Sequence, residues 1–298
     1  MGAEQIPLAG SWIDRDVATR SSEAALEAAW NEPDARVLRI FGVNVPIMRG
    51  ELSPRLELLP TAGFFAEASH RIYLGRKDGT PIFAVAIGDE TQGGVTSEWI
   101  HPFEVSLELS PAERELVVIA SALARWHESA LWSARDGELT EWADGGWSRR
   151  DSRGGELFPR MDPAVIVLIE HEGKVLLGSN TLWESGRFSL LAGFVEAGES
   201  LEQAVAREIF EEAGVRLGKT RYMGSQPWPF PRSLMLGFRA QLAEGQDPDA
   251  LVPDTQEISE LRWFSREELA DPPVGIRLPT KLSISGWLIA DWVSEGDR

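Results

Sequence analysis

Three glutamates in this chain have the types and spacing that most clearly predict chemistry. Glu208, Glu211 and Glu212 stand at positions i, i+3 and i+4 of a segment with helical periodicity, so their carboxylates share one face of the expected helix. Like charges at this spacing repel one another unless a positive charge lies between them. Carboxylate oxygens are ligands that suit Mg²⁺ or Mn²⁺. The pattern therefore predicts a divalent-cation site, although a solvated acidic helix face would show the same spacing.

The segment around these glutamates has the features of a helix with defined ends. We expect the helix over residues 200–213, with Ser200 as its N-cap and Gly214 as its C-terminal stop. The apolar residues that recur at four-residue spacing are Leu201, Val205 and Ile209. Such a stripe predicts that one side of the helix packs against a core.

The run 193–215 also resembles a known signature. It fits the Nudix pattern at every fixed position: Gly193, Glu199, Arg207-Glu208-Ile209, Glu211-Glu212 and Gly214-Val215. The chain thus resembles a Nudix hydrolase, an enzyme that uses a divalent cation to cut a diphosphate linked to another moiety. The resemblance implies Mg²⁺ or Mn²⁺ as the cofactor, with Glu208, Glu211 and Glu212 as ligands. It also implies a share of general-base catalysis for Glu211 or Glu212.

The resemblance gives structural roles to other residues of the run. Arg207 stands one turn before Glu211, so we expect it to hold that carboxylate in place and not to touch substrate. Gly193 and Gly214 are expected to serve the backbone, because glycine accepts turns and helix ends that other residues resist.

Residues outside the run enter through the same resemblance. Residues 256–264 resemble the family's downstream segment, whose acidic residue acts at the metal or as the base. Glu257 is the match, and Glu260 is the nearby fallback. Ala192 is expected to ligate the metal through its backbone carbonyl. Ser285 stands where the family usually has alanine, and we expect it at the substrate.

A second motif follows ten residues later, at residues 225–233. It reads Ser-Gln-Pro-Trp-Pro-Phe-Pro-Arg-Ser. Its three prolines exclude a helix interior and argue against a central strand. Taken alone, it predicts a rigid extended connector in which Trp228 and Phe230 are core residues. At this place in the chain, it resembles the signature of the NADH pyrophosphatase subfamily of Nudix hydrolases.

The subfamily resemblance implies a substrate. Such enzymes cleave NAD(H) at its pyrophosphate to NMN(H) and AMP, and family members also remove NAD caps from RNA 5′ ends. The residues expected to bind the dinucleotide are Gln226, Pro227, Trp228, Pro229, Phe230, Pro231, Arg232 and Ser233. Phe158 and Phe194 are candidates for stacking on a base or on the nicotinamide ring. Either ring is equally a candidate core aromatic.

Two other functions stay open. One is a Nudix hydrolase of another nucleoside diphosphate derivative, such as ADP-ribose or a dinucleoside polyphosphate. The motif at 225–233 argues against it, because those subfamilies lack the motif. The other is a non-catalytic Nudix regulator that senses a nucleotide. Such proteins commonly lose the glutamates that this chain keeps at positions 208, 211 and 212.

Length and charge bound the remaining choices. The chain has 298 residues, which is long enough for two domains. Its formal net charge is −18. This charge argues against binding of duplex nucleic acid, because no basic stripe is present for the phosphates. We expect a cytoplasmic protein that does not insert into membranes, since it has no apolar run of transmembrane length and no charged-then-apolar leader. The resemblance implies a homodimer.

The order of expected elements suggests an α/β protein in three parts. We expect an α+β domain at residues 1–128 and a linker at 129–159. The catalytic domain follows at 160–298, as the α/β/α sandwich with a mixed sheet that is typical of Nudix proteins. His127, which has no histidine or cysteine partner nearby in the sequence, is expected to be structural.

The linker resembles a zinc ribbon that lacks its cysteines. In many relatives this region holds zinc through two CxxC pairs, but the present chain has no cysteine. Ser133 and Asp136 stand at the spacing of the first pair, and we match no residues to the second. We therefore expect no zinc, and a linker held by hydrogen bonds and by packing of Trp132, Trp142 and Trp147.

Overall fold

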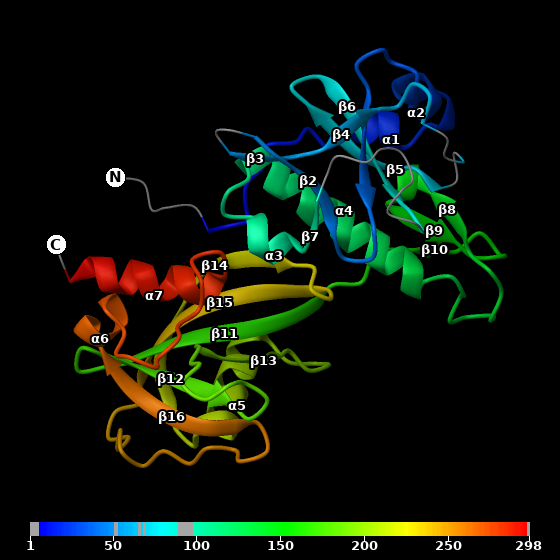
Figure 1. Cartoon of the computed structure of the whole chain (residues 1–298). Coiled ribbons are helices and arrows are strands. Elements are labelled where there is room, and N and C mark those ends of the chain that lie inside the picture. The colour runs from blue at the N-terminus through cyan, green and yellow to red at the C-terminus, as the bar shows by residue number, and fades with distance from the viewer. Residues whose placement is uncertain (1–5, 51–52, 65–66, 68–69, 89–97, 297–298) are drawn as a thin grey trace. The chain divides into compact units, whose positions relative to one another are not determined.

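The chain folds into two compact units. The computed structural model (Figure 1) describes residues 6–50, 53–64, 67, 70–88 and 98–296. One unit contains residues 6–9, 161–228 and 233–296, and the other contains residues 10–160 and 229–232. Apart from residues 6–9, the described residues of the expected N-terminal domain and linker thus fall in the second unit. Across the described ranges, no helix has both the length and the apolar character needed to cross a membrane.

A six-stranded mixed sheet forms the centre of the first unit. Its strands are β11 (Asp162–His171), β12 (Lys174–Asn180), β13 (Leu191–Phe194), β14 (Leu217–Trp228), β15 (Ser233–Leu242) and β16 (Ile258–Ser265). The strand order is β14-β15-β11-β12-β16, and β13 pairs with β11. Only the β11–β15 pair is parallel. The motif at 225–233 spans the end of β14, an edge strand, where proline does not interrupt a central ladder.

Helices cover both faces of this sheet, because side chains alternate along β11. Val165 and Val167 point to the face that packs against α5 (Leu201–Ala213). Ile166 and Leu168 point to the opposite face, which packs against α7 (Ile284–Glu295). The short helix α6 (Arg266–Ala270) adds Leu269 to that second core. This confirms the expected α/β/α sandwich with a mixed sheet.

The helix that carries the three glutamates has the predicted ends. Ser200 and Gln203 form a capping box at its start. Gly214 ends it with a φ of 71°, in the left-handed region that glycine adopts at little cost. Val205 and Ile209 are fully buried in the core beneath α5. The predicted limits and the buried stripe of this helix are therefore confirmed.

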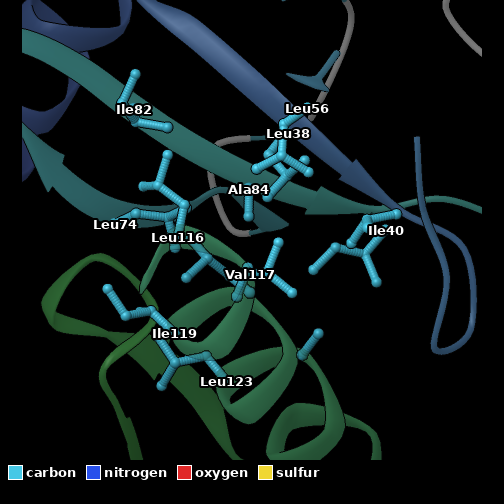
Figure 2. Packing of buried hydrophobic residues seen from close by; sticks show 14 of the residues in the cluster. Leu38, Ile40, Leu56, Leu74, Ile82, Ala84, Leu116, Val117, Ile119 and Leu123 are labelled. Atoms are coloured by element: carbon cyan, nitrogen blue, oxygen red, sulfur yellow. The ribbon is translucent and has the colours of Figure 1, made fainter. Parts of the chain in front are cut away.

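The second unit is an α+β assembly. Its elements before residue 130 are α1 (Val17–Arg20), α2 (Glu23–Trp30), β1 (Arg36–Ile40), β2 (Val45–Arg49), β3 (Pro54–Leu56), β4 (Leu58–Pro60), β5 (Ile72–Lys77), β6 (Thr80–Ala86), β7 (Glu98–Ile100), α3 (Pro102–Val105) and α4 (Pro111–Ser129). Strands pair in the orders β4-β1-β6-β5 and β3-β2-β7. Figure 2 shows Leu116 and Val117 of α4 on the side of the helix that faces the four-stranded sheet with Leu38 and Ala84, and Leu123 belongs to the same buried cluster.

The expected linker at residues 129–159 forms a small antiparallel sheet. Its strands are β8 (Glu141–Ala143), β9 (Ser148–Arg150) and β10 (Glu156–Leu157). The turn that contains Asp136 lies against the turn that contains Asp151. Asp136 accepts a hydrogen bond from the Ser152 hydroxyl at 2.9 Å, and Arg135 pairs with Asp151 at 3.3 Å. These polar contacts join the turn at the spacing of the first expected CxxC pair to the turn at residues 151–152, which the sequence did not predict.

Two of the three expected tryptophans pack this region. Trp142 stacks on His127 with ring centroids 3.5 Å apart, and Trp147 donates a hydrogen bond to the Tyr73 carbonyl at 2.7 Å. Trp132 is 62% exposed, so the expectation that it packs the linker is wrong. Trp132 pairs with Leu139 in an isolated β-bridge, and both side chains are exposed. The Trp132 ring therefore lies outside the core.

His127 has the structural role expected of it. Arg149 donates to its Nδ1 at 2.9 Å, so Nε2 carries the hydrogen and donates to the Gly146 carbonyl at 2.8 Å. Burial lowers the pKa of His127 to about 4. The ring is therefore held neutral, in one tautomer, at the junction of α4 with the small sheet.

We predict that the purified protein carries no stoichiometric zinc and that EDTA leaves its melting temperature unchanged. A ribbon built on CxxC pairs needs four soft donors, and the contacts described above use none. Elemental analysis and thermal denaturation with and without EDTA measure this. One tightly bound zinc per chain, or a large fall in melting temperature, would contradict it.

We also predict that the neutral His127 makes the second unit acid-sensitive. Its pKa is lower in the folded state than in the unfolded state, so below about pH 6.5 the unfolded chain binds a proton that the folded chain does not. Stability from this group is therefore lost as the pH falls from about 6.5 to about 4. The advantage of the wild type over His127→Gln in urea unfolding should shrink across that window. An advantage that is constant with pH would refute the assignment.

Candidate active site

Arg207 organises the acidic face of α5. Its guanidinium donates to both carboxylate oxygens of Glu199, at 2.6 and 2.9 Å. It also donates to Glu208 and Glu211, each at 2.9 Å, and to the Phe194 carbonyl at 2.9 Å. The sequence predicted the contact with Glu211. The structure adds the other partners, so one cation joins α5 to β13 and to the loop before the helix.

These contacts shift the pKa values of both partners. The hydrogen bonds from Arg207, and then the Glu196 N–H, lower the pKa of Glu199 to about 2. The hydrogen bonds to Glu199, with those to Glu208 and Glu211, raise the pKa of Arg207. Arg207 therefore supplies a permanent positive charge beside the glutamates. Glu199 belongs to the run that resembles the Nudix signature, but its role as the main partner of Arg207 was not predicted.

The absence of a side chain at Gly193 makes room for the Glu208 carboxylate. A Cβ atom at Gly193 would collide with the Glu208 carboxylate carbon and with both of its oxygens. The backbone of β13 thus comes directly under this carboxylate, which any larger residue would displace. Burial raises the pKa of Glu208, while the hydrogen bond from Arg207 acts in the opposite direction. The structural role expected for Gly193 therefore has a steric cause at this strand.

Glu212 is the most deeply buried carboxylate of the group. The residue is only 7% exposed, and its Oε2 accepts a hydrogen bond from the Ala192 N–H at 3.1 Å. Burial raises the pKa of Glu212 to about 8, and the charges of Glu208, Glu257 and Asp254 act in the same direction. A carboxylate in such surroundings is stabilised by a nearby cation. The predicted role of the Ala192 carbonyl as a metal ligand stays a prediction.

Glu257 joins this group, as the sequence predicted. It lies in the turn before β16, and its charge raises the pKa of both Glu208 and Glu212. The fallback residue Glu260 is an exposed residue of β16 that pairs with Ser179. The charge of Asp254 also raises the pKa of Glu212. The sequence analysis did not predict a role for Asp254. The signal that points to it is an aspartate three residues before the expected ligand.

The donor set of this face suits a hard divalent cation. Hard divalent cations prefer carboxylate oxygens, which this face provides. The Glu212 carboxylate is buried, and Gly193 makes room for the Glu208 carboxylate. Within the described ranges, no three histidine or acidic side chains already form a complete ligand set. Glu208 and Glu211 are instead bonded to Arg207. The residues that would hold the ion are Glu208, Glu211, Glu212 and Glu257.

Two residues expected at the substrate are instead enclosed by the protein. Gln226 is fully buried, and its amide donates to the carbonyls of Pro7 and Leu282 at 2.6 and 2.8 Å while accepting from the Ile284 N–H at 2.8 Å. These bonds give Gln226 a structural role in place of direct contact with a dinucleotide. Ser285 is likewise buried, and its hydroxyl contacts the Ser189 hydroxyl at 3.0 Å.

The other motif residues are distributed over both units. Pro227 and Trp228 are half-buried at the end of β14, and Ser233 begins β15. The remaining residues of the motif, Pro229, Phe230, Pro231 and Arg232, belong to the second unit. There the half-buried Phe230 ring lies 4.3 Å from the Phe103 ring, between centroids, and Phe103 is itself partly exposed.

The two rings expected to stack on substrate are both solvent-exposed. Phe158 is 64% exposed in the second unit, and Phe194 is 58% exposed at the end of β13 in the first. Neither is therefore a core aromatic. Phe194 also lies beside the acidic face, because its carbonyl is bonded to Arg207.

Comparison with known proteins identifies relatives of the whole chain. A family model described as NUDIX domain matches residues 159–281. A solved NUDIX hydrolase from Nitrosomonas europaea aligns with a TM-score of 0.39 and 26% identity, over 46% of this chain and 78% of that chain. A protein named NAD-capped RNA hydrolase NudC from Mycobacterium bovis is 38% identical over 301 residues, which cover 94% of this chain and 92% of the relative. A protein of the same name from Pseudomonas syringae pv. tomato is 36% identical, over 74% of this chain and 76% of the relative.

We predict that Gly193→Ala weakens Mn²⁺ binding by about tenfold or more without unfolding the protein, because the added methyl displaces the Glu208 carboxylate. Calorimetric titration with Mn²⁺ measures the affinity, and circular dichroism checks the fold. Gly88→Ala is the matched control, since a Cβ there meets no atom within 4 Å. Equal affinity in Gly193→Ala and the control would contradict the role of this glycine.

Proposed function

The chain belongs to the Nudix family of hydrolases, in its NADH pyrophosphatase subfamily, and on this premise we propose that it hydrolyses the pyrophosphate of NAD(H). The reaction adds water across the P–O–P bridge and gives NMN(H) and AMP. The same bond cleavage would remove an NAD cap from the 5′ end of RNA. The names of the relatives from Mycobacterium bovis and Pseudomonas syringae, which are NAD-capped RNA hydrolases, support cleavage of an NAD pyrophosphate on RNA.

The observation that carries the proposal is the buried Glu212 carboxylate. It lies among other carboxylates, with its pKa raised to about 8 by burial and by their charges. A buried carboxylate among other carboxylates is suited to bind a divalent cation. We propose Mg²⁺ or Mn²⁺, held by Glu208, Glu211, Glu212 and Glu257, with the Ala192 carbonyl as a further ligand. The bound ion would also let a chain with a net charge of −18 approach an anionic substrate.

When bound, the ion supplies positive charge that stabilises the developing charge on the pyrophosphate oxygens and lowers the pKa of water. Around it, the protein orients the carboxylates: Arg207 fixes Glu208 through Oε1, and the Ala192 N–H fixes Glu212 through Oε2. Glu211 is bonded to Arg207 through Oε2 and has a side chain that is 55% exposed. We propose that Oε1 of Glu211 or the carboxylate of Glu257 takes the proton of the attacking water.

The substrate contacts are proposed on exposed residues. Phe194 is exposed beside the acidic face, and its ring is suited to stack on a base or on nicotinamide. Phe158, Trp228 and Arg232 are further candidates, with Arg232 suited to an anionic group. Gln226 and Ser285 act on the fold, through α7, and not on the ligand directly.

The alternatives make different predictions for substrate. A hydrolase of ADP-ribose or of a dinucleoside polyphosphate would use the same acidic face. The first would prefer a ligand smaller than NAD(H), and the second a larger one. A nucleotide-sensing regulator would bind without turnover. The carboxylates of α5 and Glu257 favour catalysis over sensing, and the motif at 225–233 favours NAD(H).

Incubation with Mn²⁺ or Mg²⁺ tests the proposal. NADH, NAD⁺, ADP-ribose and NAD-capped RNA are supplied separately, and the products are resolved by chromatography. We expect AMP and NMNH from NADH, and a 5′-monophosphate on the RNA. Turnover of ADP-ribose alone, or no turnover of any substrate with either ion, would overturn the assignment.

We also propose that the protein acts as a homodimer, which is inferred from the family resemblance. Sedimentation analysis at micromolar concentration tests the dimer, and a monomer under all conditions would contradict it.

We predict that Glu212→Gln lowers kcat by at least ~10² while the fold is retained, because charge at this position is needed most in the transition state. The amide is isosteric and can still accept from the Ala192 N–H, so little rearrangement is expected. Glu202→Gln is the control, since Glu202 lies on the same helix and is exposed. Near-normal turnover with unchanged Mn²⁺ affinity would remove Glu212 from the site.

A further inference from the structure

The chain makes a tight turn at Asp254, just before the glutamate that joins the acidic face. Its Oδ1 accepts the Gln256 N–H at 2.9 Å. Its carbonyl accepts the N–H groups of Glu257 and Ile258, at 3.0 and 2.7 Å. A side chain that bonds to the backbone two residues later is an Asx turn. The side chain of Asp254 therefore sets the conformation from which Glu257 extends.

The same turn is attached to the C-terminal end of α5. The Asp254 N–H donates to the Glu212 carbonyl at 3.4 Å, and the Val252 N–H donates to the Ala213 carbonyl at 2.9 Å. The last carbonyls of a helix have no partner within the helix, so these bonds satisfy groups that need one. Gly214 permits this approach, because a Cβ at that position would lie 2.8 Å from the Val252 side chain.

A third segment holds the turn from its other side. The Thr181 N–H donates to the Glu257 carbonyl at 2.8 Å, and the Thr181 hydroxyl donates to the Gln256 carbonyl at 3.0 Å. Thr181 directly follows β12, whose last residue is Asn180. The backbone of Glu257 is thus bonded to the turn at Asp254 and to the end of a central strand.

We propose that Asp254 is a positioning residue that fixes the Glu257 carboxylate against the acidic face of α5, through the Asx turn and its bond to the Glu212 carbonyl. The proposal rests on the proposed function, since Glu257 is there a ligand of the ion. Residues that orient metal ligands commonly change metal affinity or activity by about 10- to 100-fold when they are replaced. Asp254 acts through Glu257 and is not itself assigned to the ion.

Two substitutions at Asp254 separate geometry from charge. Asp254→Ala removes the Oδ1 acceptor and with it the Asx turn. Asp254→Asn removes the charge but keeps an oxygen that accepts the Gln256 N–H. Thr181→Val is a second route to the same effect, because it removes the hydroxyl bond to Gln256 without changing any charge.

Asp247→Ala is the matched control. Asp247 makes the same kind of turn in the same connection, since its Oδ1 accepts the Asp249 N–H at 2.9 Å. Its carbonyl accepts from Gln246 and Ala250, so its bonds stay within its own loop.

Two quantities are measured for each variant: the Mn²⁺ affinity by calorimetry, and kcat for NADH hydrolysis. We expect Asp254→Ala to lose about tenfold or more in both, and Asp254→Asn to stay within about threefold of the wild type. Thr181→Val should show a smaller loss in the same direction, and Asp247→Ala should match the wild type.

Three results would overturn the proposal. Asp254→Asn as defective as Asp254→Ala would show that the charge and not the turn is required. A variant Asp254→Ala that matches the wild type would show that the turn is not needed. A fall in melting temperature with unchanged Mn²⁺ affinity and kcat would show a purely structural role. If the wild type binds Mn²⁺ but does not cleave NADH, the proposed function fails, and the Mn²⁺ affinities alone still decide the role of Asp254.

Discussion

The placement of several carboxylates in one partly buried region is the constraint on which the rest of this site depends. Burial raises the pKa values of Glu208 and Glu212, and the negative charge of Glu257 acts in the same direction on both, so the fold has to bring positive charge or hydrogen-bond donors to them. Arg207 supplies the charge from within α5, and the Ala192 N–H supplies a donor from β13. The close approach of β13 to α5, made possible by Gly193, is therefore required by electrostatics as much as by packing.

Local features of the sequence were enough to predict α5, whereas the sandwich around it was expected from the order of the elements and from the Nudix resemblance. The cap at Ser200, the stop at Gly214 and the stripe that includes Val205 depend on neighbours in the sequence, and the structure has all three. Residues whose roles depend on distant segments were harder. Gln226 bonds to Pro7 and Ile284, which lie 219 and 58 residues away, and no spacing rule could have shown that its amide is fully used by the backbone.

The second unit shows the same limit in another form. The lack of cysteines predicted a linker held by hydrogen bonds, and contacts such as Ser152 with Asp136 supply them. Their partners are set by how two turns meet, which the sequence pattern did not specify. Trp132 illustrates the difference, because composition suggested a buried ring whereas its place on the hairpin's outer surface leaves it exposed.

The most direct test of this account is the location of the catalytic ion. Crystals grown or soaked with Mn²⁺, with data collected at the manganese absorption edge, would show the ion as an anomalous peak. The account predicts a peak bounded by the carboxylates of Glu208, Glu212 and Glu257, with the Gly193 backbone beneath Glu208. A peak elsewhere in the protein, or a fully occupied ion that touches none of these three glutamates, would contradict it.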